Sequence, residues 1–240
     1  KIEELTDKFA AHKLVPLWPA TATEWSTKEA RDAFFASPLL PRLRSDQALQ
    51  RTISDGVSKG LLGYRIALIR AAQQKKLDSV HNLDDLRQLK FGLGPGWGDV
   101  SVYKAAGLPV LIAEYEDLFK MLSFGRFDLF SRGVNEIFSE YQAQKGNLPN
   151  LAIEQHLLLY YPYPFYLFVS PQTPALAERI ERGMRVMLDD GSFDAIFRKH
   201  NRVAIQQADM KHRRIINIPN KLLPSKTPLS DARLWYKPGN

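Results

Sequence analysis

Residues 90–146 read KFGLGPGWGDVSVYKAAGLPVLIAEYEDLFKMLSFGRFDLFSRGVNEIFSEYQAQKG, and this stretch decides the fold class. Short apolar runs alternate in it with segments whose apolar side chains recur at helical spacing. Strands are expected at 90–94, 108–113 and 127–130, and helices are expected to begin at Asp99, Tyr115 and Ser131. This alternation predicts a parallel sheet flanked by helices, which binds ligands at the carboxyl ends of its strands, beside helix N-termini.

Two longer apolar segments, Leu61–Arg70 and Pro164–Ser170, bracket this unit and are expected to be strands that pass between two lobes. Residues 71–163 then form an inserted lobe, and residues 1–70 with 164–240 form the other. The sequence therefore predicts a two-lobed α/β protein, each lobe a mainly parallel sheet flanked by helices. A helix is expected from Thr173-Pro174, a shorter one from Ser192, and an extended strap from Ile215 to Asn240.

Composition excludes several classes of protein. The chain has 240 residues, of which 45% are apolar and 25% charged, as in soluble globular proteins with a sizeable core. It has no cysteine, which rules out disulfides, thiol catalysis and cysteine-ligated metals. No apolar run is long enough to span a membrane.

The net charge of +7 is concentrated in residues 198–226, where eight lysines and arginines face a single acid, Asp209. Such a stretch is able to bind an anionic polymer or an anionic membrane surface. No aromatic residue interleaves the basic ones, as base stacking requires, so a solvated face is favoured and nucleic acid is not an expected partner.

Several motifs, in this order and spacing, resemble those of the type II periplasmic solute-binding proteins. The motifs are Gly60–Arg65, Ser79–Arg87, Leu118–Asp128, Pro164–Pro171, Ala177–Phe193 and Leu222–Trp235. The chain looks closest to the bacterial transporter substrate-binding domains that are family 3-like, and the likeness covers roughly residues 60 to 240. It departs from that family at residues 2–13, an expected helix where relatives begin with a strand, so the first lobe is expected to be incomplete.

The resemblance implies reversible capture of a small polar solute, amino-acid-like or otherwise carboxylate-bearing, in a cleft that closes about hinge strands. It implies a monomer of the bacterial periplasm that serves ABC-type uptake or sensing and meets a membrane permease or a signalling partner. No cofactor is implied. The alternatives are an enzyme on the same two-lobed scaffold and an anionic-polymer or surface binder that uses residues 198–226.

Two helix starts in the inserted lobe are the expected receptors for an anionic group. The first offers Gly96, Trp97, Gly98 and Asp99, although a tight turn with a packed tryptophan explains the same residues equally well. The second offers Ser131 and Arg132, with Glu136 one turn along. We expect Arg132 to pair with a carboxylate, and Glu136 to take a ligand ammonium or to orient the arginine. An exposed helical ion pair is the structural alternative.

In the other lobe, the candidate ligand-binding residues are Trp18, Thr21, Tyr64 and Arg65. Trp18 precedes small polar residues that suit a loop, and Arg65 is expected to be a charge facing the cleft. Core packing of Trp18 and Tyr64 is at least an equal alternative.

Enzyme signatures do not occur in the sequence. There is no Gly-x-Ser-x-Gly turn, no H-E-x-x-H motif and no phosphate-binding loop with Gly-Lys-Ser/Thr. The five histidines show no paired metal spacing. No catalytic residue and no metal site are therefore predicted.

Overall fold

The computed structural model describes residues 52–53, 58–165, 167–168, 174–224 and 227–239. These residues lie within one compact unit, residues 52–169 and 174–240. The helix expected at 2–13, and the candidates Trp18 and Thr21, lie outside the described residues.

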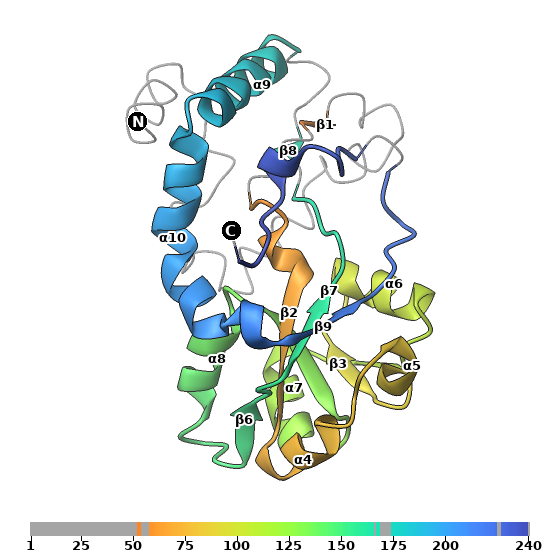
Figure 1. Ribbon diagram of the computed structural model, residues 1–240. Helices are drawn as coiled ribbons and strands as arrows, with labels where there is room; N and C mark the ends of the chain where they lie inside the picture. Colours follow the sequence, from red (N-terminus) through yellow and green to blue (C-terminus); the bar gives the residue numbers. More distant parts are fainter. Residues whose placement is uncertain (1–51, 54–57, 166, 169–173, 225–226, 240) are drawn as a thin grey trace. The chain divides into compact units, whose positions relative to one another are not determined.

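A seven-stranded sheet forms the centre of this unit (Figure 1). Its strands are β2 (Tyr64–Arg70), β3 (Phe91–Leu93), β4 (Val110–Ile112), β5 (Leu129–Gly133), β6 (Leu151–Ile153), β7 (Leu157–Tyr160) and β9 (Arg214–Asn217). The order is β4-β3-β5-β2-β7-β9, and β6 pairs with β2. β3 is parallel to β4 and β5, and β7 is parallel to β9, whereas β2 runs antiparallel to its neighbours β5, β6 and β7. The predicted α/β fold with a sheet flanked by helices is confirmed, although the sheet is mixed.

Seven α-helices accompany the described strands. They are α4 (Gln74–Leu77), α5 (Leu83–Leu86), α6 (Gly98–Ala105), α7 (Tyr115–Ser123), α8 (Ile137–Gln144), α9 (Pro174–Asp189) and α10 (Ser192–Ala208). The 3-10 turns are η3 (Leu61–Gly63), η4 (Ala71–Gln73), η5 (Met210–His212) and η6 (Ala232–Leu234), and β1 (Thr52–Ile53) pairs with β8 (Leu167–Phe168) in a separate two-stranded sheet.

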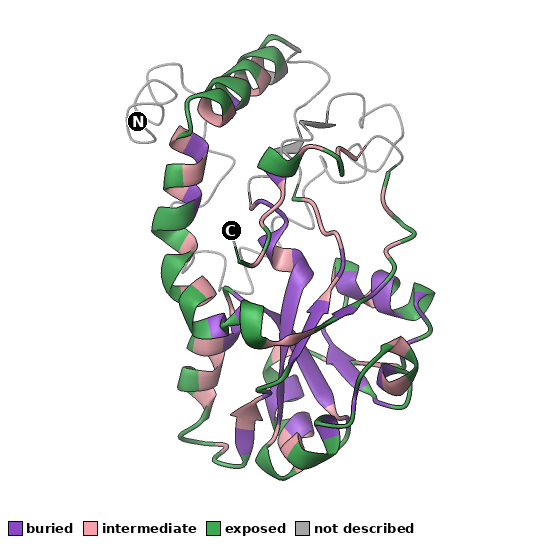
Figure 2. Cartoon of the chain, in the orientation of Figure 1, coloured by how far each residue is buried: buried purple, intermediate pink, exposed green. Residues whose placement is uncertain are grey.

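The central strand β2 is buried on both faces, which is why its sequence is almost continuously apolar (Figure 2). Successive side chains of a strand point to opposite faces. Ala67 and Ile69 pack in one core cluster, with residues of α4, α5 and α6. Ile66 and Leu68 pack in the other, with residues of α7, α8 and α10. Two apolar cores therefore cover the two faces of the sheet.

Several local expectations are wrong. The helix expected to open at Ser131 begins at Ile137, because Ser131 and Arg132 continue β5 and pair with β2. The strand expected over Leu61–Arg70 begins only at Tyr64, after a 3-10 turn. The helix from Ser192 is longer than the one from Pro174 rather than shorter. The strap expected from Ile215 starts instead as β9 in the sheet.

The sheet also draws strands from outside the range 71–163. β2 precedes that range and β9 follows it, yet both pair with strands that lie within it. The division into one lobe of residues 1–70 plus 164–240 and another of residues 71–163 remains a prediction, because residues 1–51 lie outside the described residues.

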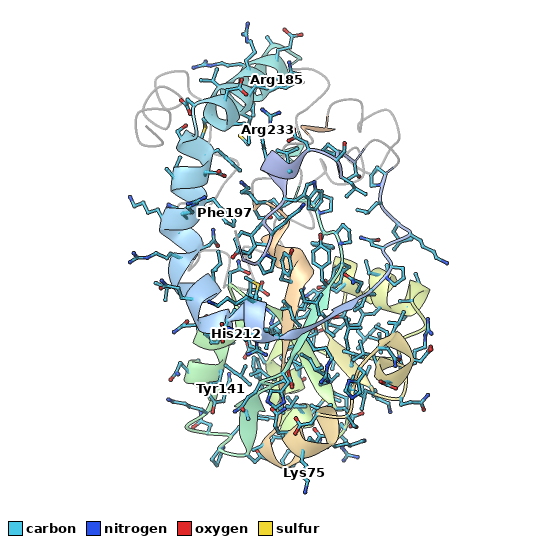
Figure 3. All side chains as sticks on the ribbon, viewed as in Figure 1. Lys75, Tyr141, Arg185, Phe197, His212 and Arg233 are labelled. Carbon is cyan, nitrogen blue, oxygen red and sulfur yellow. The ribbon has the colours of Figure 1, made fainter. Side chains whose placement is uncertain are left out.

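The C-terminal segment is hydrogen-bonded to residues at and just before the start of β2. The Tyr236 N–H donates to the Lys59 carbonyl at 2.7 Å, and the Tyr64 hydroxyl donates to the Tyr236 carbonyl at 2.9 Å. Phe197 points from α10 towards this segment (Figure 3), and its ring centroid lies 5.8 Å from that of Tyr236. Residues distant in sequence thus hold the start of the strand that carries Arg65.

Candidate functional site

Four chain segments bring polar side chains to one edge of the sheet. β3 and β5 are parallel, so their carboxyl ends meet at this edge. β2 is antiparallel to β5 and to β7, which places the start of β2 and the end of β7 there as well. The α6 helix begins just after β3. This is the edge at which α/β sheets hold ligands.

Arg65, the second residue of β2, is buried in a network of oxygen acceptors. Its Nη2 donates to Asp99 Oδ1 at 2.8 Å and its Nε donates to the Tyr161 hydroxyl oxygen at 3.0 Å. The Tyr161 hydroxyl in turn donates to Asp99. Burial alone would lower the pKa of Arg65, but Tyr161, Asp99 and Glu136 reverse this effect and raise it, so the guanidinium stays charged.

Asp99 is a buried partner of Arg65, and the helix expected to begin at this residue begins at Gly98. The N-cap of α6 is Trp97, whose side chain makes no capping hydrogen bond. Asp99 lies one residue inside the helix and directs its carboxylate at Arg65. The position in the first turn still favours a negative charge, because the helix dipole is positive there.

Arg132 lies on the opposite face of the sheet, in a cage of aromatic rings and carboxylates. Its Nε and Nη2 donate to the two oxygens of Glu140 at 2.7 and 2.6 Å, a bidentate ion pair. The guanidinium carbon is 4.6 Å from the ring centroid of Trp97, 5.5 Å from that of Tyr115 and 5.4 Å from that of Phe130.

Glu136 joins the two arginines at the sheet edge. Its Oε2 accepts from the Gly133 N–H at 2.9 Å and lies 3.3 Å from Arg132 Nη2 and 3.5 Å from Arg65 Nη1. Burial would raise the pKa of Glu136, but Arg132, Arg65 and the Gly133 N–H outweigh it and lower the pKa. Its side chain is 33% exposed, the most accessible of the network's charges.

The remaining candidates fall in different surroundings. Ser131 is buried beneath the network, where its hydroxyl lies 2.7 Å from that of Tyr103. Tyr64 points to the other face from Arg65 and packs against Tyr160, with the ring centroids 4.5 Å apart and the ring planes tilted by 31°. Gly96 is exposed in a left-handed turn that favours glycine, and Gly98 lies against the Tyr163 hydroxyl.

The structure therefore brings Arg65, Trp97, Asp99, Arg132 and Glu136 together, and their part in binding remains a prediction. Sequence reasoning missed Glu140 and Tyr161, which complete the two ion-pair systems. Glu140 follows Glu136 by one helical turn, so the spacing of the two acids on one face of α8 was a usable signal. Nothing in the sequence marks Tyr161 among the neighbouring tyrosines.

Two arginines of the basic stretch 198–226 make structural hydrogen bonds. Arg213 donates to the backbone carbonyls of Ala208, Glu154 and Leu157, and Arg214 donates to those of Asp78 and Val80. These two cations tie β9 and the end of α10 to the rest of the sheet. They are poor candidates for contacts with an anionic polymer.

The described residues include neither a metal-binding cluster nor a membrane-spanning helix. No cluster of three or more histidine or acidic side chains is arranged there to hold a metal ion. None of the described helices combines the length and apolar character needed to cross a bilayer.

The buried tyrosines give a prediction for alkaline pH. Burial raises the pKa of Tyr103 and of Tyr161 above the ordinary value. The unfolded chain, whose tyrosines ionise near pH ~10, then loses protons first, so the free energy of unfolding should fall as pH rises above about 10. Denaturant titrations at rising pH test this, and Tyr103→Phe should reduce the slope. A stability that stays constant from about pH 9 to 11 in the wild type would show that these phenols ionise freely.

Several solved structures are similar to this chain. The chain is similar to an ancestral arginine-binding protein bound to arginine, with 22% identity over 65% of this chain and 67% of the other, at a TM-score of 0.42. It is similar to an amino acid ABC transporter substrate-binding protein from Streptococcus pneumoniae bound to L-arginine, with 14% identity over 67% of this chain and 65% of the other, at a TM-score of 0.43. A third is an arginine transport system periplasmic binding protein from Legionella pneumophila, with 15% identity over 65% and 68% of the two chains, at a TM-score of 0.43.

These structures are binding proteins of the kind that the sequence motifs resemble, and the match spans about two thirds of each of them. No protein-family model and no curated protein matches the chain.

Proposed function

We propose that the chain binds a small polar solute reversibly, at the sheet edge where Arg65, Asp99, Arg132, Glu136 and Glu140 meet. The observation that carries this proposal is the concentration of two arginines and three carboxylates at a strand-end edge. Buried ion pairs contribute little net stability compared with apolar residues of the same volume. Charged groups with perturbed pKa values cluster instead at functional sites, such as ligand-binding sites.

The proposed solute is amino-acid-like, and its capture involves closure of two lobes. The predicted division into lobes supplies the second wall of the site. A solute that contacts both walls favours the closed form by its differential affinity for that form. We also propose that this binding serves uptake through an ABC-type permease, or sensing, in the periplasm of a bacterium. The chain acts in it as a binding protein and not as an enzyme.

A thermal-shift screen against amino acids, polyamines, organic acids and sugars tests the proposal. A compound present at a hundred times its dissociation constant should stabilise the folded protein by about 2.7 kcal/mol. Arginine and glutamine are sensible first compounds, because solved structures similar to this chain are bound to them. The compound should be recovered unchanged. Its conversion to a product would favour the enzyme alternative, and the lack of any stabilising compound would contradict the proposal.

A further inference from the structure

Both arginines already make side-chain hydrogen bonds within the protein. Arg132 gives its Nε and Nη2 to Glu140, and Arg65 gives its Nε and Nη2 to Tyr161 and Asp99. Their side chains are only 9% and 4% exposed. A solute carboxylate would have to displace Glu140 from this bidentate pair in order to bind Nε and Nη2 of Arg132. The sequence-based expectation that Arg132 takes a ligand carboxylate therefore finds no support in this geometry.

The charges of the network do not balance. Three carboxylates, Asp99, Glu136 and Glu140, face two guanidinium groups, so the cluster carries one excess negative charge. The lowered pKa of Glu136 keeps this carboxylate ionised at neutral pH. A site with this balance attracts a positive group and repels a negative one.

Glu136 is the most accessible of the three carboxylates. All the contacts that the structure records for the Glu136 carboxylate go to Oε2, from the Gly133 N–H, Arg65 and Arg132. Within the part of the chain that the structure describes, Oε1 has no recorded partner. Trp97 and Tyr163, half-buried at the same edge, each pack against one of the two guanidinium groups and supply aromatic surface of the kind that binds cations.

From these observations we infer that the solute presents a cation, an ammonium or guanidinium group, to Glu136, and that Arg132 serves as an internal partner of Glu140 and receives no solute carboxylate. This inference rests on the proposed function and narrows its substrate class to cationic solutes. The end of the solute that faces Glu136 and Arg132 then needs no carboxylate.

Matched pairs of compounds test the inference on the whole chain. Cadaverine is lysine without its carboxylate, agmatine is arginine without its carboxylate, and glutarate carries carboxylates alone. In titration calorimetry, cadaverine or agmatine should bind within about tenfold of its parent amino acid, and glutarate should not bind. If only carboxylate-bearing compounds bind, the inference is overturned while the proposed function stands. If no compound of any class binds, both fail.

Two substitutions address Glu136 itself. Glu136→Gln keeps the size of the side chain and leaves both arginines with their main partners, so it should fold and should weaken the binding of the cation at least about tenfold. Gly133→Ala places a Cβ 2.9 Å from Glu136 Oε2 and should displace that carboxylate with a similar loss. Glu181→Gln, which removes an acid that pairs with Arg185 on α9, is the matched control and should bind normally. Unchanged affinity in Glu136→Gln, with a normal melting temperature, would overturn the assignment.

Discussion

Replacement of Arg65 by methionine should lower the free energy of unfolding by about 3–5 kcal/mol, which is among the largest effects expected of a single change in this chain. Arg65 is 4% exposed, and its loss leaves Asp99 buried without its cation. The cost arises from the uncompensated carboxylate more than from the lost attraction. Denaturant unfolding of the wild type and the variant measures it.

A double variant separates these two contributions. Arg65→Met with Asp99→Leu removes both charges, so much of the lost stability should return, as replacement of buried ion pairs by apolar residues often allows. A loss below about 1 kcal/mol in Arg65→Met alone would mean that Arg65 behaves as an exposed charge. That result would contradict the buried network.

Replacement of Gly63 by alanine should destabilise the fold by about 3 kcal/mol or more, the second large effect. An added Cβ would lie 2.1 Å from the Tyr161 carbonyl oxygen and 3.3 Å from the Tyr163 nitrogen, which are both backbone atoms and are therefore unable to rotate away. The change would force β2 away from the segment after β7 that holds Tyr161.

Gly183 provides the matched control for this substitution. It lies inside α9 and an added Cβ would meet nothing within 4 Å. Gly183→Ala should therefore raise the free energy of unfolding by about 0.5–1 kcal/mol, because alanine favours the helix. Equal stability of Gly63→Ala and the wild type in denaturant unfolding would contradict the close approach of the two segments.

The sequence predicted the elements between Phe91 and Ser123 well, because there the chemistry is local. Apolar periodicity distinguishes strand from helix, and Gly107 and Gly125 adopt the positive φ that ends a helix. Local sequence signals gave a wrong prediction at Ser131 and Arg132. A serine after an apolar run is typical of a helix start, yet here pairing with β2 extends the strand.

The composition of the site was only partly predictable. Trp97 and Asp99 follow β3 and Glu136 follows β5, where ligand-binding residues are expected, while Arg132 lies near the end of β5 and Arg65 near the start of β2 at the same edge. Their pairing was not predictable, because it depends on which strand face each side chain occupies and on contacts across distant segments. Arg65 finds Asp99 on α6, whereas Arg132 finds Glu140 on α8.

Amide hydrogen exchange with and without a stabilising compound shows whether a solute binds at this sheet edge. The compound should slow exchange in residues 63–66, 94–99 and 131–136. Exchange in residues 198–214 should change little. Protection confined to 198–214, with exchange at the sheet edge unaltered, would contradict binding at this edge.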